Sequence, residues 1–205
     1  MFFKSLFNSN PNKKATKQFF ASALLHASQG DYAKAIELYS KAIDAGGANN
    51  YSNVFYNRAN AKASCGDNRG AIEDYSTSIK LNDTGNGFDA YYNRANSKLS
   101  INDIEGAVED FTQVIKVNPK FGPAFTSRAR VYAQLGKHHL SMNDYLKAIE
   151  IDDNALRYET CLGLADAYYN LKDYPNAKSW YEFALAYNRS SQEATIKLEE
   201  LGKKK

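Results

Sequence analysis

Apolar residues recur at helical spacing along most of the chain, and short polar breaks interrupt them. In the stretch 69–81, for example, Ile72, Tyr75 and Ile79 stand at i, i+3 and i+7, which places them on one face of a helix. Breaks that contain Gly, Asn or Asp, such as Gly66-Asp67, are typical of helix ends and tight turns. The pattern predicts an all-α fold made of short amphipathic helices.

A small residue followed four positions later by an aromatic residue recurs through this pattern, and successive aromatic positions lie 34 or 36 residues apart. A fixed period of this size predicts a solenoid of stacked units, because one unit cannot bury its apolar face alone. We expect such a protein to hold a partner on an extended surface. The pairs are Ala35/Tyr39, Ala71/Tyr75, Ala107/Phe111, Ser141/Tyr145 and Ala177/Tyr181.

Each period reads as two helices joined by a short turn. The predicted pairs are 14–28 with 32–45, 54–64 with 69–81, 91–99 with 104–117, 123–135 with 138–151, and 160–171 with 175–187. These pairs divide residues 14–189 into repeats at about 16–51, 52–87, 88–121, 122–157 and 158–189. A last helix, predicted over 191–201 with Ala194, Ile196, Leu198 and Leu201 as its apolar positions, fits a cap over the open end of the stack. Residues 190–205 therefore form a capping helix and a lysine tail.

Residues 1–13 begin with an aromatic stretch, Met1 to Phe7, which is too short for the apolar core of a signal peptide. The segment Asn8–Asn12 then reads as a turn or linker. One interpretation is a flexible N-terminal arm. The other is an aromatic arm that docks on the solenoid, on a partner or weakly on a membrane.

The chain resembles the tetratricopeptide repeat (TPR) family over residues 16–189. The resemblance lies in a small residue within the first helix of each pair, a glycine at the turn, and small and aromatic residues along the second helix. In the first repeat these positions are Ala23, Gly30, Ala35, Tyr39 and Ala42, whereas Asn102 and Lys172 replace the turn glycine in the third and fifth repeats. The resemblance implies a right-handed superhelical solenoid of antiparallel helix pairs, whose first helices line a concave groove.

Charge and composition exclude several classes of function. The formal net charge is only +3, which gives no basic field for nucleic acid. Cys65 and Cys161 lie in different repeats and read as reduced thiols, which favours a cytoplasmic protein. No stretch is long and apolar enough to span a membrane. The sequence carries no metal-ligand, phosphate-loop or catalytic motif, so we expect neither a cofactor nor an enzyme.

Arginine and aspartate occur together in the three middle repeats, always 16 residues apart. The first and fifth repeats lack both, with Ser22/Leu38 and Leu164/Trp180 at these positions. This joint occurrence predicts a partly buried ion pair between the two helices of each middle repeat, since an arginine fork can bind a carboxylate with two hydrogen bonds. The alternative is an arginine row that binds acidic ligands. The pairs are Arg58/Asp74, Arg94/Asp110 and Arg128/Asp144.

The first helices of the second and third repeats carry asparagines at i, i+3, so each pair of asparagines shares one helix face. An asparagine side chain offers both a donor and an acceptor, as a peptide backbone does. Together with the family's groove positions, this predicts a surface for an extended peptide; the alternative is an ordinary solvated helix face. The predicted peptide-binding residues are Phe20, Tyr56, Asn57, Asn60, Tyr92, Asn93, Asn96, Ser127 and Arg130.

The resemblance also raises the carboxylate clamp with which some family members hold acidic C-terminal tails. That clamp is incomplete here, because Phe20 and Leu24 stand where lysine and asparagine are needed. The sequence thus favours a non-catalytic scaffold or adaptor that binds a protein or peptide partner. The alternative function is structural assembly by self-association through the arm at Met1–Phe7 or the loops at Gly46–Tyr51 and Thr84–Phe88.

Overall fold

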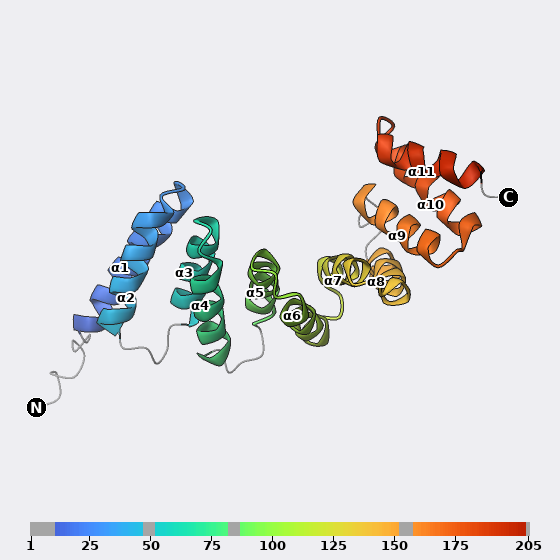
Figure 1. The fold of residues 1–205 in the computed structure, drawn as a ribbon. Helices are drawn as coiled ribbons and strands as arrows, with labels where there is room; N and C mark the ends of the chain where they lie inside the picture. Colours follow the sequence, from blue (N-terminus) through green and yellow to red (C-terminus); the bar gives the residue numbers. More distant parts are fainter. Residues whose placement is uncertain (1–10, 47–51, 82–86, 152–157, 204–205) are drawn as a thin grey trace, which may run out of the picture. The chain divides into compact units, whose positions relative to one another are not determined.

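The computed structural model describes residues 11–46, 52–81, 87–151 and 158–203, and every regular element in these ranges is an α-helix (Figure 1). This result confirms the all-α prediction. The helices are α1 (Pro11–Ser28), α2 (Tyr32–Gly46), α3 (Ser52–Ser64), α4 (Asn68–Leu81), α5 (Phe88–Ser100), α6 (Ile104–Val117), α7 (Gly122–Gln134), α8 (His138–Ile151), α9 (Tyr158–Asn170), α10 (Tyr174–Tyr187) and α11 (Gln192–Gly202).

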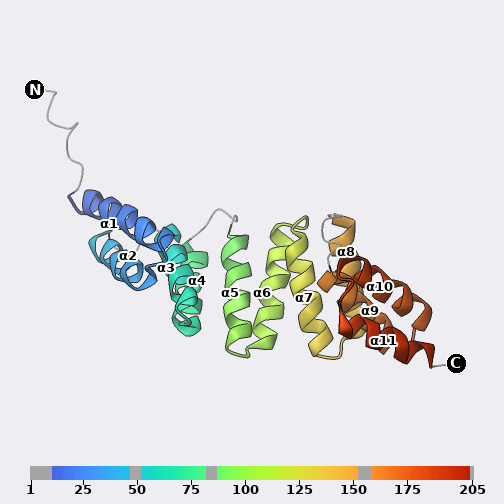
Figure 2. The same cartoon turned by 90° about the horizontal axis from the view of Figure 1, so that it is seen from above.

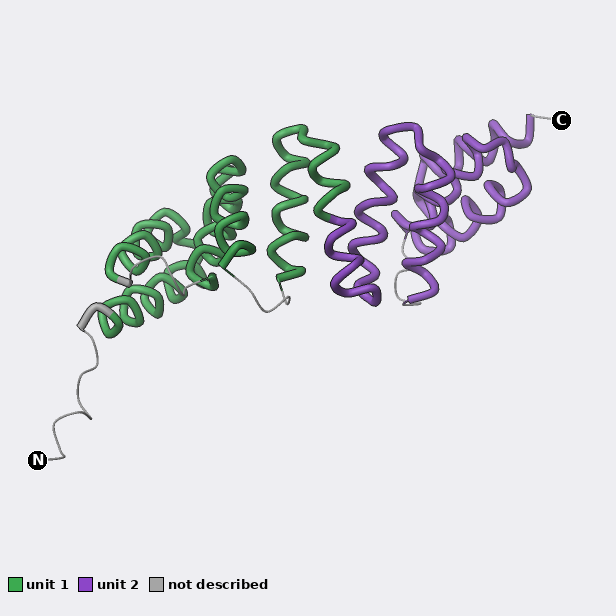
Figure 3. Tube along the Cα trace, turned by 90° about the horizontal axis from the view of Figure 1, so that it is seen from below, with its two compact units in different colours: residues 1–110 green, residues 111–205 purple. Residues whose placement is uncertain are grey.

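Consecutive helices form antiparallel pairs, seen from a second side in Figure 2. The chain divides into two compact units, residues 1–110 and 111–205, and α6 spans the boundary between them (Figure 3). In unit 1, α1 packs on α2, α3 packs on α4, and α4 packs on α5. In unit 2, α7 packs on α8 and α9 packs on α10.

The predicted helix ends agree with the observed ones to within three residues. The largest differences are at the starts of α1 and α5, and at α1 the turn or linker expected at Asn8–Asn12 gives way to helix from Pro11 onwards. Proline suits a first helical turn, where its fixed φ fits and its missing N–H has no intrahelical partner to lose. The predicted arm of residues 1–13 is therefore too long at its C-terminal end, and residues 1–10 lie outside the described residues.

The turn inside each pair has one geometry in all the repeats. Its second residue has a positive φ, which is +81° at Gly30 and +63° at both Asn102 and Lys172. The next residue's N–H reaches back five residues, as in Asp31 to the His26 carbonyl, and this bond completes a Schellman motif. Asn102 and Lys172 therefore adopt the left-handed backbone conformation that glycine has in the other turns, and lysine does so at a steric cost.

The residue after that turn caps the second helix in most repeats. Asp31, Asp67, Asp103 and Asp173 each accept a hydrogen bond from the backbone N–H three residues later. The fourth repeat has Lys137 at this position, and lysine has no acceptor with which to cap a helix.

The core of each pair is built from the small and aromatic residues that defined the period. Tyr39, Tyr75, Tyr145 and Tyr181 are buried, and alanines that pack beside them, such as Ala35 and Ala177, have no exposed surface. Small side chains let the helices approach closely, and the aromatic rings fill the remaining space. Ser141, at the alanine position of the fourth repeat, is also fully buried, and its hydroxyl has no hydrogen-bond partner in the described part of the chain.

Helix α11 packs on α10 at the end of unit 2. Ala194 and Leu201 are buried in one cluster with Ala177 and Tyr181 of α10, and Leu198 packs at its edge. Ile196, predicted as part of the apolar face, is instead 53% exposed. It lies two positions from both Ala194 and Leu198, which turns it away from their face of the helix.

Candidate functional site

Each predicted arginine lies against its predicted aspartate, and the contact joins the two helices of one pair. Arg94 donates from Nε to Asp110 Oδ2 at 2.8 Å and from Nη2 to Asp110 Oδ1 at 2.7 Å. Arg58/Asp74 and Arg128/Asp144 repeat this fork at 2.7–2.9 Å. Burial favours a neutral Arg94, but the hydrogen bonds and charge of Asp110 outweigh it and raise the pKa of Arg94. These arginines therefore have a carboxylate partner inside the protein.

A lysine strengthens two of the three pairs. Lys62 Nζ lies 2.8 Å from Asp74 Oδ2, and Lys98 Nζ lies 2.9 Å from Asp110 Oδ2. In the fourth repeat the equivalent residue is Tyr132, whose ring lies 5.6 Å from the Arg128 guanidinium carbon. Among the described residues, Asp144 thus has Arg128 as its one cationic partner.

Each arginine also reaches the preceding helix pair. Nη1 of Arg58, Arg94 and Arg128 donates to a hydroxyl on the second helix of the repeat before, at 2.8–3.0 Å. The acceptors are Ser40, Ser76 and Thr112. These contacts were not predicted, although the sequence carries a signal for them: a hydroxyl residue follows the aromatic position only where the next repeat has an arginine. Leu146 precedes Leu164 at the corresponding positions.

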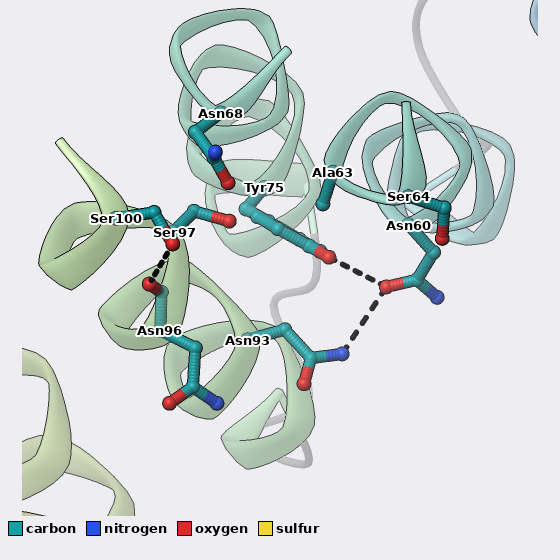
Figure 4. Close-up of a pocket in the computed structure, with 9 residues that line it drawn as sticks. All are labelled: Asn60, Ala63, Ser64, Asn68, Tyr75, Asn93, Asn96, Ser97 and Ser100. Atoms are coloured by element: carbon teal, nitrogen blue, oxygen red, sulfur yellow. Dashed lines mark hydrogen bonds between the residues drawn. The ribbon is translucent and has the colours of Figure 1, made fainter. Parts of the chain in front are cut away.

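A polar pocket of about 460 Å³ lies between α3 and α5, with Tyr75 of α4 on its wall (Figure 4). None of its lining residues carries a charge, and all but Ala63 have a polar side chain. Small side chains from α3 and α5 leave it open to solvent. The lining residues are Asn60, Ala63, Ser64, Asn68, Tyr75, Asn93, Asn96, Ser97 and Ser100.

Hydrogen bonds connect Asn60 and Asn93 across the pocket. Asn60 Oδ1 accepts from the Tyr75 hydroxyl at 2.6 Å and from Asn93 Nδ2 at 3.1 Å. Asn93 Nδ2 also donates to the Tyr56 hydroxyl at 3.0 Å. Burial raises the pKa of Tyr75, so its hydroxyl stays protonated and available as a donor. The two helices therefore present amides whose orientation is already set.

The other two predicted asparagines, Asn57 and Asn96, differ in whether their side-chain amides are already hydrogen-bonded. Asn57 Nδ2 donates to the Asn53 carbonyl of its own helix at 2.7 Å, and Asn57 does not line the pocket. Asn96 lines the pocket, and its amide has no partner among the described residues. The aromatic residue of its repeat is Phe111, which has no hydroxyl to donate. Asn96 is thus the amide in this pocket most available to a ligand.

The remaining predicted residues lie elsewhere. Phe20 is half-buried on α1 with its ring 5.9 Å from that of Tyr39, and Tyr92 is half-buried on α5. Ser127 is only 6% exposed, so it offers a ligand little surface. Arg130 is exposed on α7, which belongs to unit 2.

In unit 2 a tyrosine on the second helix of a pair again donates a hydrogen bond to a side chain on the first helix, but the acceptor is a carboxylate and not an amide. Tyr181 donates to Asp166 Oδ1 at 2.5 Å, at the same 15-residue spacing as Tyr75 and Asn60. Burial raises the pKa of Asp166, and it outweighs the Tyr181 hydrogen bond and the charge of Lys197, which lower it. Gly163 stands where α5 has Asn93, and a Cβ there would collide with the Tyr145 ring. This part of unit 2 therefore has no asparagine pair.

The described residues contain no cluster of metal-binding side chains. None of the described helices is long and apolar enough to cross a membrane.

Solved structures with similar folds share little sequence with this chain. A crystal structure of MamA has 20% identity and a TM-score of 0.77, covering 86% of this chain and 93% of that one. A tetratricopeptide repeat protein from Parabacteroides merdae ATCC 43184 has 18% identity and a TM-score of 0.79, with coverages of 92% and 72%. YrrB, described as "a TPR protein with an unusual peptide-binding site", has 13% identity and a TM-score of 0.76, with coverages of 92% and 97%. At these identities the likeness concerns the fold.

Comparison with curated protein sequences finds no match. Family models described as tetratricopeptide repeat match residues 19–50, 88–121, 123–154 and 158–191, which together make up more than half of the chain. The chain belongs to the tetratricopeptide repeat family.

Proposed function

We propose that this protein is a non-catalytic adaptor that holds an extended segment of a partner protein in the α3–α5 pocket. Tetratricopeptide repeats are in general scaffolds for protein–protein interaction, and the fold supports this broad role. The observation that carries the finer proposal is the lining of the pocket: amides and small hydroxyls without a charge, between the first helices of two neighbouring repeats.

The chemistry of the lining favours a peptide main chain over charged ligands. A pocket for phosphate or for an acidic tail needs cationic donors, and this pocket has none. Amides supply both donors and acceptors, which a main chain needs because it alternates C=O and N–H. Tyr56 and Tyr92 add amphipathic surface beside the amides. The same lining gives no reason to expect a nucleic acid.

An apolar surface lies on the first helix of the same unit. Leu24 is 41% exposed on α1, one period before Asn60, and Phe20 lies one turn away from it. A peptide that extends from the pocket towards α1 would therefore gain from an apolar side chain at that end. The peptide-binding site named in the description of YrrB is a property of that protein, and it adds support for a related use of the fold here.

The test is a selection of unstructured peptides, displayed as a random library, on the whole chain. Selected peptides would be measured by fluorescence anisotropy against the unchanged protein, Asn96→Ala and Ser64→Trp. The first variant removes the available amide, and the second fills the open side of the pocket. The control is Asn143→Ala, which removes an exposed asparagine of α8 outside the pocket.

We expect both pocket variants to weaken binding at least about tenfold, and Asn143→Ala to leave it unchanged. Equal binding by all the proteins would refute the proposed site, and failure to select any peptide would refute the proposed function. The self-association alternative depends on the arm at Met1–Phe7 and on the loops at Gly46–Tyr51 and Thr84–Phe88, which lie largely outside the described residues. A concentration-dependent mass that disappears when residues 1–10 are deleted would favour that alternative.

A further inference from the structure

Helix α10, labelled in Figure 1, differs from the second helices of the other repeats in the charge of its outer face. Three positions define this face, which lie two before, two after and five after the buried aromatic residue. In α10 they hold Ser179, Phe183 and Ala186, and none of these is charged. Every other second helix has at least two charged residues there. Its residues are Glu37, Lys41 and Asp44 in α2, Glu73, Thr77 and Lys80 in α4, Glu109, Gln113 and Lys116 in α6, and Asn143, Lys147 and Glu150 in α8.

Aromatic side chains form a row along this uncharged face of α10. Trp180, Phe183 and Tyr187 stand at i, i+3 and i+7, which places them on one side of the helix, and we call these three residues the aromatic row. Phe183 and Tyr187 are each 54% exposed, and the ring centres of Trp180 and Phe183 lie 5.4 Å apart. Asn176 and Ser179, which share this side, are exposed and uncharged. An exposed apolar patch of this kind marks an interaction surface.

The aromatic row is anchored in the core at one end, and the charges of α10 lie on another side of the helix. Trp180 packs against the buried cluster that contains Tyr145 and Leu164. Lys178 and Glu182 line a cavity together with residues of α11. Because the anchored tryptophan holds its neighbour Phe183 in place, the row presents a fixed surface, and binding there has little side-chain motion to arrest.

We propose that the aromatic row is an interface between two copies of this chain, which pair through α10 in antiparallel orientation about a twofold axis near Phe183. In a twofold dimer each surface meets a copy of itself, so a charge at the axis would meet its own like. The outer face of α10 has no such charge. Phe183 stands between Trp180 and Tyr187, so antiparallel pairing sets Phe183 beside its copy and Trp180 of one chain beside Tyr187 of the other. This surface lies apart from the first helices, and the proposal is independent of the peptide pocket.

The exposed area of the aromatic row fits a weak dimer. An aromatic side chain offers about 150–250 Å², so the half-exposed Phe183 and Tyr187 each leave on the order of 100 Å² to be buried. The face of one helix is therefore smaller than the roughly 800 Å² per partner that a stable complex buries. We expect a dissociation constant on the order of 10–100 µM.

The test is sedimentation equilibrium of the whole chain at concentrations from about 5 to about 500 µM, together with tryptophan fluorescence. Trp180 is the only tryptophan in the sequence, so its emission reports on α10 alone. The variants are Phe183→Lys and Phe183→Glu, and Lys147 at the same position of α8 shows that a second helix accepts a charge there. The control is Ile196→Lys, because Ile196 is 53% exposed and is turned away from the face of α11 that packs on α10.

We expect the unchanged protein to dimerise and the Trp180 emission to move to shorter wavelength as the concentration rises. Each Phe183 variant should weaken dimerisation at least about tenfold, and Ile196→Lys should leave it unchanged. An equimolar mixture of Phe183→Lys and Phe183→Glu should recover dimers, because opposite charges then meet at the axis.

Deletion of residues 1–10 should leave this dimer intact, which separates it from self-association through the N-terminal arm. A protein that stays monomeric up to about 500 µM would overturn the inference. A dimer that Phe183→Lys leaves unchanged, or one that forms without a shift of the Trp180 emission, would also overturn it. A mixture of the two Phe183 variants that stays monomeric would overturn the antiparallel pairing about Phe183.

Discussion

Replacing Arg128 by methionine removes the fork that holds Asp144 and keeps much of the apolar stem. Asp144 is only 7% exposed, and its ion pair with Arg128 is the one it has among the described residues. The substitution therefore leaves a buried carboxylate without a counter-charge. Breaking a buried pair in this way costs about 3–5 kcal/mol of unfolding free energy, and we expect about 4 kcal/mol here.

Arg94→Met is the matched comparison. Asp110 is as deeply buried as Asp144, at 2% exposed, but Lys98 stays 2.9 Å from its Oδ2 after the arginine is removed. One ion pair therefore survives, and the expected loss is about 2 kcal/mol. The difference between the two variants isolates the contribution of the lysine, since both lose the same fork.

Both losses are measured by urea unfolding followed by helical circular dichroism at neutral pH. The double variant Arg128→Leu/Asp144→Leu should recover most of the loss of Arg128→Met, because it removes the stranded charge as well. Equal losses for Arg128→Met and Arg94→Met would refute the assigned role of Lys98. A double variant no more stable than Arg128→Met would show that the lost packing, and not the stranded carboxylate, causes the destabilisation.

Three further substitutions have expected outcomes in the same unfolding assay. Lys172→Gly should raise the unfolding free energy by about 1 kcal/mol, because glycine adopts the observed φ of +63° without strain; an equal gain at Lys178, inside α10, would contradict this reason. Lys137→Asp should add about 1 kcal/mol by supplying the missing cap of α8, and the gain should disappear in Lys137→Leu. Because burial raises the folded-state pKa of Asp166 above 3.8, the folded state binds the proton more tightly, so stability should fall as pH rises from about 4 through the raised pKa. Asp166→Asn should remove that fall, and an unchanged pH profile would contradict the assignment.

The repeat period of the sequence was sufficient to predict the helix pairs, because every repeat buries small and aromatic residues at the same positions. Helix ends were less predictable, since they depend on single capping residues such as Pro11, which opens α1 although its neighbours suggest a linker. The exposure of Ile196 was missed for a related reason: an apolar residue type was given more weight than its angular position on α11.

Some contacts of the candidate site could also be predicted from the sequence, and others could not. The spacing of arginine and aspartate within a repeat indicated their contact, and the structure brings them together. The bonds between Asn60 and Asn93 could not be predicted, because they depend on how far α5 is offset from α3 and on the side-chain conformations between them. The low exposure of Ser127 was hidden as well, since the family pattern assigns positions and not the neighbours that cover them.

Each of the three arginines donates a hydrogen bond to a hydroxyl of the preceding repeat, and this bond determines which repeats could be exchanged without losing a contact. A repeat that begins with the arginine needs a predecessor that ends with Ser or Thr after its aromatic residue, as Ser40, Ser76 and Thr112 show. The second and third repeats satisfy the rule on both sides, so gene duplication could lengthen the protein there with every directional bond retained. The fifth repeat has Leu164 at the arginine position and Glu182 after its aromatic residue, so it could not replace the second or third repeat without losing these bonds.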